Sequence, residues 1–238
     1  MFFFKKKPLV VDCFTHLPMA YDYTKPEIAS KFMPDWFKQM PKTVTTTDGF
    51  SKGPTIKNCA GLIDLYSRGI MLSLWCDVSI EIGKIGVNDY RWQFSDRDHS
   101  AVIHHKDQIG SHFNDKQFAH LKLVSPWFLA TKEQVYWLWQ EPTWNDLYNY
   151  DYKIIPAIVE FKHQHATNVN MMFKRKEQTN IHHMEYGTPL AHIIPIADNR
   201  KVILKHHLVE HQEILKYTTP RLKFFDNYKN KIKQWSKR

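Results

Sequence analysis

Histidine is the residue type through which this chain is best equipped to do chemistry. The sequence of 238 residues contains 14 histidines, and all but one of them fall between His99 and His211. Imidazole is the commonest protein ligand for transition metals and the usual acid or base near neutral pH. A metal centre or an acid–base site is therefore the first hypothesis to weigh.

One set of residues has the order of a non-haem iron centre. His105 and Asp107 share one face of an extended segment, and His192 comes from a later strand. Two imidazoles and a carboxylate form a facial triad that leaves positions open on Fe(II). Arg200 suits the carboxylate of 2-oxoglutarate. The order resembles that of the Fe(II)/2-oxoglutarate oxygenases, although chance alone supplies about one His-x-Asp in such a chain.

A second set uses two histidines of one expected strand, residues 153–165. Alternation along it places His163 and His165 on the inward, apolar face. With His120 or His192 as a third ligand they resemble a cupin metal site, but residues 166–170 lack the glutamate that cupins place there. A third interpretation is that the histidines are hydrogen-bonded structural residues with no metal.

Other catalytic motifs are missing from the sequence. It has no nucleophile elbow, phosphate loop, dinucleotide-binding glycine motif or HExxH zinc motif. Cys13, Cys59 and Cys76 are too widely spaced for a CxxC unit and lie beside apolar residues, which predicts buried, reduced thiols. The N-terminal phenylalanines precede the lysines, the reverse of a signal peptide, and no run approaches the ~18 apolar residues of a spanning helix. A cytoplasmic location is expected.

The elements that must position these residues are mainly strands. From Ile70 onward, β-branched and aromatic residues are frequent and apolar residues alternate with polar ones. Short connections between the segments predict antiparallel hairpins. The even spacing favours an antiparallel sandwich, a jelly roll or a double-stranded β-helix. The expected strands are 71–82, 89–95, 118–129, 134–140, 153–165, 168–175, 179–184, 189–196 and 201–207.

Helices are expected on both sides of this β region. Thr24 and Glu27 have the spacing of a capping box at a helix start, and a second helix begins at Asn58 and stops at Gly69. No linker or repeat divides the chain. We therefore expect a single domain, 1–238, composed of an irregular and helical part (1–69), a β body (70–208) and a C-terminal helical segment (209–238).

The net charge of +9 is concentrated near the C-terminus. Residues 221–238 carry seven lysines and arginines against one aspartate. Apolar residues recur there at helical spacing, which predicts an amphipathic helix docked on the body with a basic outer face. Nucleic-acid binding through this face is an alternative. The apolar stripe consists of Leu222, Phe225, Tyr228, Ile232 and Trp235.

Several short phrases occur together in one group of viral proteins. They are PDWF (34–37), MP (40–41), KNCAG (57–61), LWCD (74–77), LKLVSPW (121–127), QHATN (164–168) and GTPLAHIIP (187–195). In these phrases the chain resembles a family of tailed-bacteriophage proteins, notably from marine phages, with distant bacterial relatives. The resemblance covers about residues 34–207. It implies a viral gene product, in the host cytoplasm or in the virion, and carries over no catalytic residue.

Three hypotheses follow, in order of preference. The first is a non-enzymatic β-sandwich interaction module, either a virion component or a host-directed accessory factor, that binds itself or another protein. The second is a jelly-roll metalloenzyme that uses Fe(II) and 2-oxoglutarate. The third is nucleic-acid binding through residues 221–238.

Overall fold

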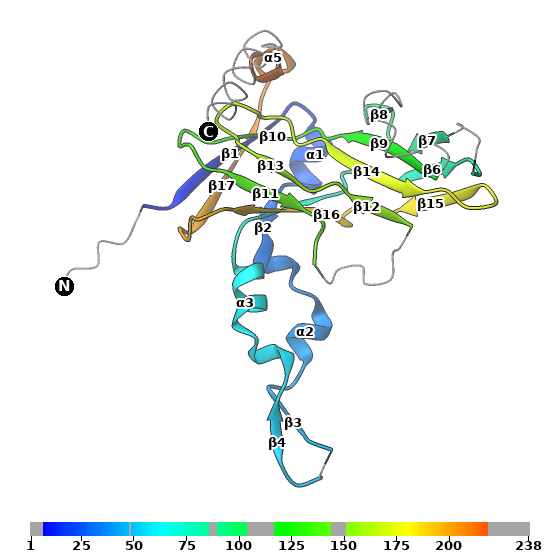
Figure 1. Ribbon diagram of the computed structural model, residues 1–238. Helices are drawn as coiled ribbons and strands as arrows, with labels where there is room; N and C mark the ends of the chain where they lie inside the picture. The colour runs from blue at the N-terminus through cyan, green and yellow to red at the C-terminus, as the bar shows by residue number, and fades with distance from the viewer. Residues whose placement is uncertain (1–6, 48, 86–89, 104–116, 144–150, 219–238) are drawn as a thin grey trace, which may run out of the picture.

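The computed structural model describes residues 7–47, 49–85, 90–103, 117–143 and 151–218. Strands dominate these residues and almost all of them pair antiparallel, which confirms the expected mainly β class and agrees with a β-sandwich. Figure 1 shows most strands gathered in one body, from which a narrow segment projects. The jelly-roll and double-stranded β-helix topologies stay predictions.

The central five-stranded sheet is antiparallel throughout. The strand order is β13 (Ala157–Val159), β11 (Trp137–Gln140), β16 (Pro189–Pro195), β5 (Ile70–Ser73) and β2 (Glu27–Ile28). The third and fourth strands, β16 and β5, are buried along most of their length, as expected for strands covered on both faces.

Two further sheets carry the alternating pattern that the sequence predicts. Buried and partly exposed residues alternate along their longer strands, so that each strand turns one face to the core. One has the order β12 (Tyr152–Ile154), β14 (Val169–Lys174), β9 (Phe118–Val124) and β8 (Ser100–Ile103). The other has the order β15 (Asn180–Met184), β6 (Val78–Ile82) and β7 (Tyr90–Phe94).

The N-terminal part differs from its expectation as an irregular and helical region. Strand β1 (Leu9–Thr15) lies between β10 (Phe128–Ala130) and β17 (Val202–Leu208) in a three-stranded sheet, and β1 and β17 run parallel. Leu9, Val11 and Cys13 alternate into the core. The alternation of apolar residues in 9–15 is thus typical of a strand. Hairpin patterns between neighbouring segments, however, give no partner for a strand that pairs with β17, near the other end of the described chain.

The expected helix start at Thr24 is wrong. Thr24 instead follows α1 (Pro18–Tyr23), and its hydroxyl donates to the carbonyl oxygen of Ala20 at 3.2 Å. The Thr24 side chain thus satisfies a carbonyl oxygen at the C-terminal end of a helix, whereas the sequence pattern places Thr24 at the N-terminal end of one. A short 3₁₀ turn, η1 (Ala29–Phe32), comes next.

Three long predicted strands are each divided. Residues 118–129 form β9 and the start of β10, with residues 125–127 between them. Residues 71–82 form β5 and β6 with a non-strand connection between them, and residues 153–165 form β12, β13 and a turn. Pro156 interrupts the run 153–165 because it has no backbone N–H for a ladder. Among the cysteines, Cys13 and Cys76 are buried as expected, whereas Cys59 is exposed.

The segment that projects from the body is called the arm here and comprises residues 33–67. In Figure 1 it extends away from β2 and ends in a hairpin. Its elements are α2 (Asp35–Gln39), β3 (Thr43–Thr45), β4 (Lys52–Pro54), η2 (Ile56–Asn58) and α3 (Ala60–Ser67). The expected glycine stop of the last helix is confirmed, since Gly69 has φ +85° just beyond it.

The helix α5 (His211–Thr218) follows the last strand. The predicted basic and apolar faces of residues 221–238 lie outside the described residues. No helix in the described part of the chain combines the length and apolarity needed to cross a membrane.

Candidate functional site

His192, a predicted metal ligand, connects the body to the base of the arm. Its side chain on β16 is fully buried, and its Nε2 lies 2.9 Å from the carbonyl oxygen of Arg68. The imidazole also stacks on the ring of Tyr66 in α3, with centroids 6.0 Å apart. Because a carbonyl oxygen only accepts, Nε2 carries the proton and donates it. His192 therefore binds the backbone at Arg68, where the chain leaves α3 and re-enters the body.

The environment of His192 favours a neutral imidazole. Burial lowers its pKa, because a charged ring loses its hydration there. Its Nδ1 is buried and has no hydrogen-bond partner among the described residues. The proposed partners His105 and Asp107 lie outside the described residues, and those that are described contain no group of three His, Cys, Asp or Glu side chains able to hold a metal ion.

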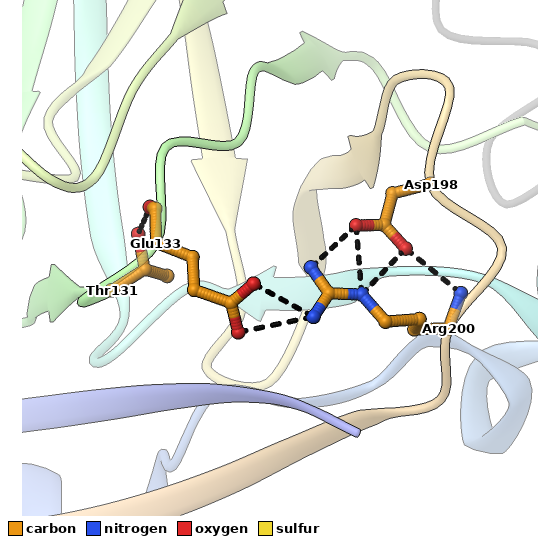
Figure 2. Close-up of polar contacts among 4 residues, drawn as sticks. All are labelled: Thr131, Glu133, Asp198 and Arg200. Atoms are coloured by element: carbon orange, nitrogen blue, oxygen red, sulfur yellow. Dashed lines mark hydrogen bonds and ion pairs between the residues drawn. The ribbon is translucent and has the colours of Figure 1, made fainter. Parts of the chain in front are cut away.

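Arg200 is paired with two carboxylates of this chain (Figure 2). Its Nη1 donates to both carboxylate oxygens of Glu133, at 3.0 and 2.7 Å, while Nε and Nη2 donate to Asp198. Hydrogen bonds to Asp198 and then Glu133 raise the pKa of the guanidinium. The sequence assigned this group to a 2-oxoglutarate carboxylate. The structure corrects that assignment, because two of the chain's own carboxylates take the bidentate positions.

The pairing of Arg200 shapes the connection between β16 and β17. Its backbone N–H also donates to Asp198 Oδ1 at 3.0 Å. Ala197, the residue immediately before Asp198, adopts φ 57°, a left-handed conformation that a non-glycine residue rarely takes. Glu133 in turn sits in a turn closed by the Thr131 hydroxyl, which donates to the Glu133 carbonyl at 2.9 Å. The guanidinium thus ties this loop to the segment before β11.

His163 and His165 do not share the strand face that the sequence predicts. Strand β13 ends before Glu160, and the chain turns through His163. His163 Nε2 lies 3.4 Å from Glu160 Oε1, whereas His165 Nδ1 lies 3.1 Å from the carbonyl oxygen of Leu129. The suggested third ligands, on β9 and β16, belong to two different sheets. The inward-facing pair required for a cupin-like site is therefore a wrong prediction.

The arm carries apolar residues but buries few of them. Within its described residues, 33–47 and 49–67, the buried side chains are Phe37 and Tyr66. Phe50, near the tip of the hairpin, is 95% exposed. Phe50 is therefore largely outside any core of the described residues. The other large apolar residues exposed on the arm are Trp36, Val44, Ile56 and Ile63.

The hydrogen bonds of the hairpin show which backbone groups of β3 face outward. The N–H of Thr46 donates to the carbonyl of Ser51 at 2.8 Å, and the N–H of Thr55 donates to the carbonyl of Lys42 at 3.0 Å. These pairs flank the β3–β4 ladder. In an antiparallel pair, successive residues turn their backbone groups alternately toward and away from the partner. Two residues of β3, one on each side of Val44, therefore direct N–H and C=O away from β4.

The two edges of this hairpin differ in their capacity to accept a further strand. The outward residues of β3 are Thr43 and Thr45, which both have an N–H. Their partners across the ladder are Pro54 and Lys52. Proline has no N–H, and proline and lysine are residues that natural proteins place on edges to block pairing. The β3 edge is therefore the open one.

Comparisons with known proteins give no relative: no family model, no curated protein and no solved structure matches the chain. Sequence reasoning expected the helix at the end of the arm, from Asn58 to Gly69, but not the β3–β4 hairpin or the projection of the arm from the body. A signal was present in its exposed aromatic residues, Trp36 and Phe50, which stand between prolines with no apolar period around them.

Proposed function

We propose that this protein is a non-enzymatic β-sandwich interaction module that associates with a second copy of itself through the β3 edge of the arm. The resemblance to tailed-phage proteins supports a viral setting, as a virion component or as an accessory factor in the host cytoplasm. The pairing of Arg200 within the chain and the anchoring role of His192 favour this function over the oxygenase alternative.

The observation that carries the proposal is the open β3 edge on an otherwise exposed hairpin. Both residues that flank Val44 on β3 are exposed, as is Val44 itself. A two-stranded hairpin without packing is at best marginally stable in water. Pairing with a further strand would satisfy the outward N–H and C=O groups and cover the apolar side chain.

The sequence of β3 favours a second copy as the partner. The strand reads Thr43-Val44-Thr45, which is the same in both directions. An antiparallel pair related by a two-fold axis through Val44 places each outward threonine opposite the other threonine of the second copy. It also sets the two valines opposite each other in the closer, non-hydrogen-bonded type of pair. Such a contact is isologous, which is the commonest arrangement in homo-oligomers.

The test measures the mass of the full chain by light scattering coupled to size-exclusion chromatography. Thr45→Pro removes an outward N–H from β3, and the matched control Lys52→Pro removes the outward N–H from the β4 edge. We expect a dimer for the wild type and for the control, and a monomer for Thr45→Pro. A monomeric wild type, or an unchanged dimer in Thr45→Pro, would overturn the proposal. Circular dichroism checks that both variants keep their β content.

A further inference from the structure

A groove lies on the body, away from the hairpin of the arm. It has a volume of about 660 Å³, within the range of about 300–1,000 Å³ that small-molecule sites occupy. Its walls come from α1, the β5–β6 connection, the β7–β8 connection and the turn between β15 and β16. The lining side chains used below are Tyr23, Trp75, Cys76, Asp77, Asp96 and Tyr186, together with Arg97 and His99.

The rim of the groove presents two tyrosines. Tyr23 is 63% exposed and Tyr186 is 47% exposed. The backbone N–H of Tyr186 donates to Asp77 Oδ1 at 2.7 Å, and its hydroxyl donates to the carbonyl oxygen of Tyr23 at 2.7 Å. Gly187, with φ +80°, lets the chain turn directly after it. The rim is therefore held in place before any ligand arrives, which reduces the entropy lost on binding.

Polar groups of both kinds stand beside these rings. Asp77 and Asp96 supply carboxylate oxygens that accept hydrogen bonds, and Arg97 supplies N–H groups that donate them. One oxygen of Asp77 accepts from the Tyr186 N–H, and Asp96 Oδ1 accepts from the backbone N–H of Asp98 at 3.1 Å, so each carboxylate keeps further acceptor capacity on its other oxygen. The groove is lined by two carboxylates and one guanidinium, so its surface is slightly acidic although the chain as a whole has a net charge of +9. An anionic ligand is therefore disfavoured.

The floor of the groove is apolar and chemically quiet. Burial raises the pKa of the Cys76 thiol to about 11, so the thiol stays protonated at neutral pH and is a poor nucleophile. Burial likewise lowers the pKa of His99. The buried indole of Trp75 has no acceptor for its Nε1–H among the described residues. These properties fit reversible binding and do not fit covalent chemistry.

The hollows around the groove indicate an elongated ligand. A hollow of about 360 Å³ shares Asp77 and Ser95 with the groove, and another of about 270 Å³ shares Tyr23. A compact cation would need aromatic faces closed around one point, whereas here the groove shares lining residues with two neighbouring hollows.

We propose that this groove binds an uncharged oligosaccharide. The C–H groups on one face of a pyranose ring carry partial positive charge and stack on the electron-rich face of an aromatic ring. Its hydroxyl groups donate to carboxylates and accept from guanidinium. Tyr23 and Tyr186 provide the stacking faces, and Asp77, Asp96 and Arg97 provide the hydrogen bonds.

The test measures binding of three uncharged trisaccharides, chitotriose, cellotriose and maltotriose, to the full chain by isothermal titration calorimetry. Saturable binding of at least one is expected. Tyr23→Ala should weaken it about 10-fold through the loss of a stacking face. Asp77→Asn should also weaken it, through the loss of a charged acceptor and of the Tyr186 contact. Tyr136→Ala is the matched control, because Tyr136 is similarly exposed, at 44%, and does not line the groove.

Three outcomes would overturn the proposal: no trisaccharide binds saturably, the affinity is the same in Tyr23→Ala, or choline binds where the trisaccharides do not. Tyr23 is mostly exposed, so its replacement keeps the test informative even if Asp77→Asn fails to fold. The self-association of the arm does not enter this experiment. Repeating the titration with Thr45→Pro separates the two proposals, since binding should be unchanged in that variant.

Discussion

An apolar side chain in the β body is usually enclosed by the core, whereas an apolar side chain in the arm usually meets solvent. Trp127, Trp137 and Phe161 are fully buried in the body, while Phe50 in the arm is almost fully exposed. Large apolar side chains therefore occur in both regions, with opposite burial. What separates them is packing: side chains from the sheets of the body form one buried cluster, whereas none of the described residues of the hairpin, 43–47 and 49–54, is buried.

The two regions meet at a small, tightly packed junction. Gly69 follows the arm, and a Cβ atom at this position would lie 2.2 Å from the carbonyl oxygen of Ile193. Beside it, His192 contacts Arg68 and Tyr66. A substitution at this junction should lower the free energy of unfolding as a core substitution does, because it disturbs buried backbone. The arm is therefore held at its base, while most of its described side chains beyond the base are exposed.

The largest expected difference between the regions comes from one substitution made in both. Phe161→Ala should lower the free energy of unfolding by about 3–5 kcal/mol, because it leaves a cavity beside Trp137, whose ring centroid is 5.6 Å away. Phe50→Ala should change it by less than about 0.5 kcal/mol, as at an ordinary surface site. Urea denaturation of the two variants at a concentration where the chain is monomeric measures both. Equal losses would show that the arm has a core of its own.

The junction should respond next most strongly. Gly69→Ala should cost about 2–4 kcal/mol, since overpacking against the Ile193 carbonyl adds to the penalty of a left-handed backbone. Gly187→Ala is the matched control, because Gly187 has φ +80° and open space around its Cβ position. The control should show only the conformational penalty, about 1–2 kcal/mol. Thermal unfolding of both variants measures the difference, and similar losses would contradict the close approach.

A smaller effect is expected from pH at the same junction. The folded state lowers the pKa of His192 below its ordinary value of 6.5. Above that value both states hold the neutral ring, and below it the unfolded chain takes up a proton that the folded chain resists. The free energy of unfolding should therefore fall as the pH is lowered through 6.5, by up to about 1.4 kcal/mol per pH unit from this group. Denaturation between pH 7.5 and pH 5, in about half-unit steps, measures the slope.

His192→Gln should reduce that slope, because glutamine keeps a donor for the Arg68 carbonyl and does not titrate in this range. His183→Gln is the control, since His183 is exposed on β15. If the control reduces the slope as much as His192→Gln does, the pH dependence does not originate at the junction.

Local patterns predicted a good part of the fold. The alternation of 189–196 corresponds to β16, and that of 168–175 corresponds to β14. Trp137 and Trp139 are both buried on one face of β11, as their spacing predicts. Patterns failed where the partner of an element is far away in sequence: β1 pairs with β17 across almost the whole chain, and no local signal names that partner.

The candidate sites show the same division. The sequence singled out His192 as a metal ligand and Arg200 as a residue that binds the co-substrate. In the structure, His192 donates to the backbone carbonyl of Arg68 just after the arm, and Arg200 binds Asp198 and Glu133. An imidazole or a guanidinium has the same intrinsic chemistry in either role. Which groups it faces is decided by distant segments of the chain.

By itself the sequence determined the mainly β class, the glycine that ends α3 and the inward faces of the longer strands, because these depend on backbone conformation and on alternation between neighbours. Only the tertiary structure decided that the arm projects with an open edge, that two tyrosines border a groove, and that His192 and Arg200 bind other groups of this chain. Those features depend on which surfaces lie opposite one another after folding, and spacing along a chain carries no information about such encounters.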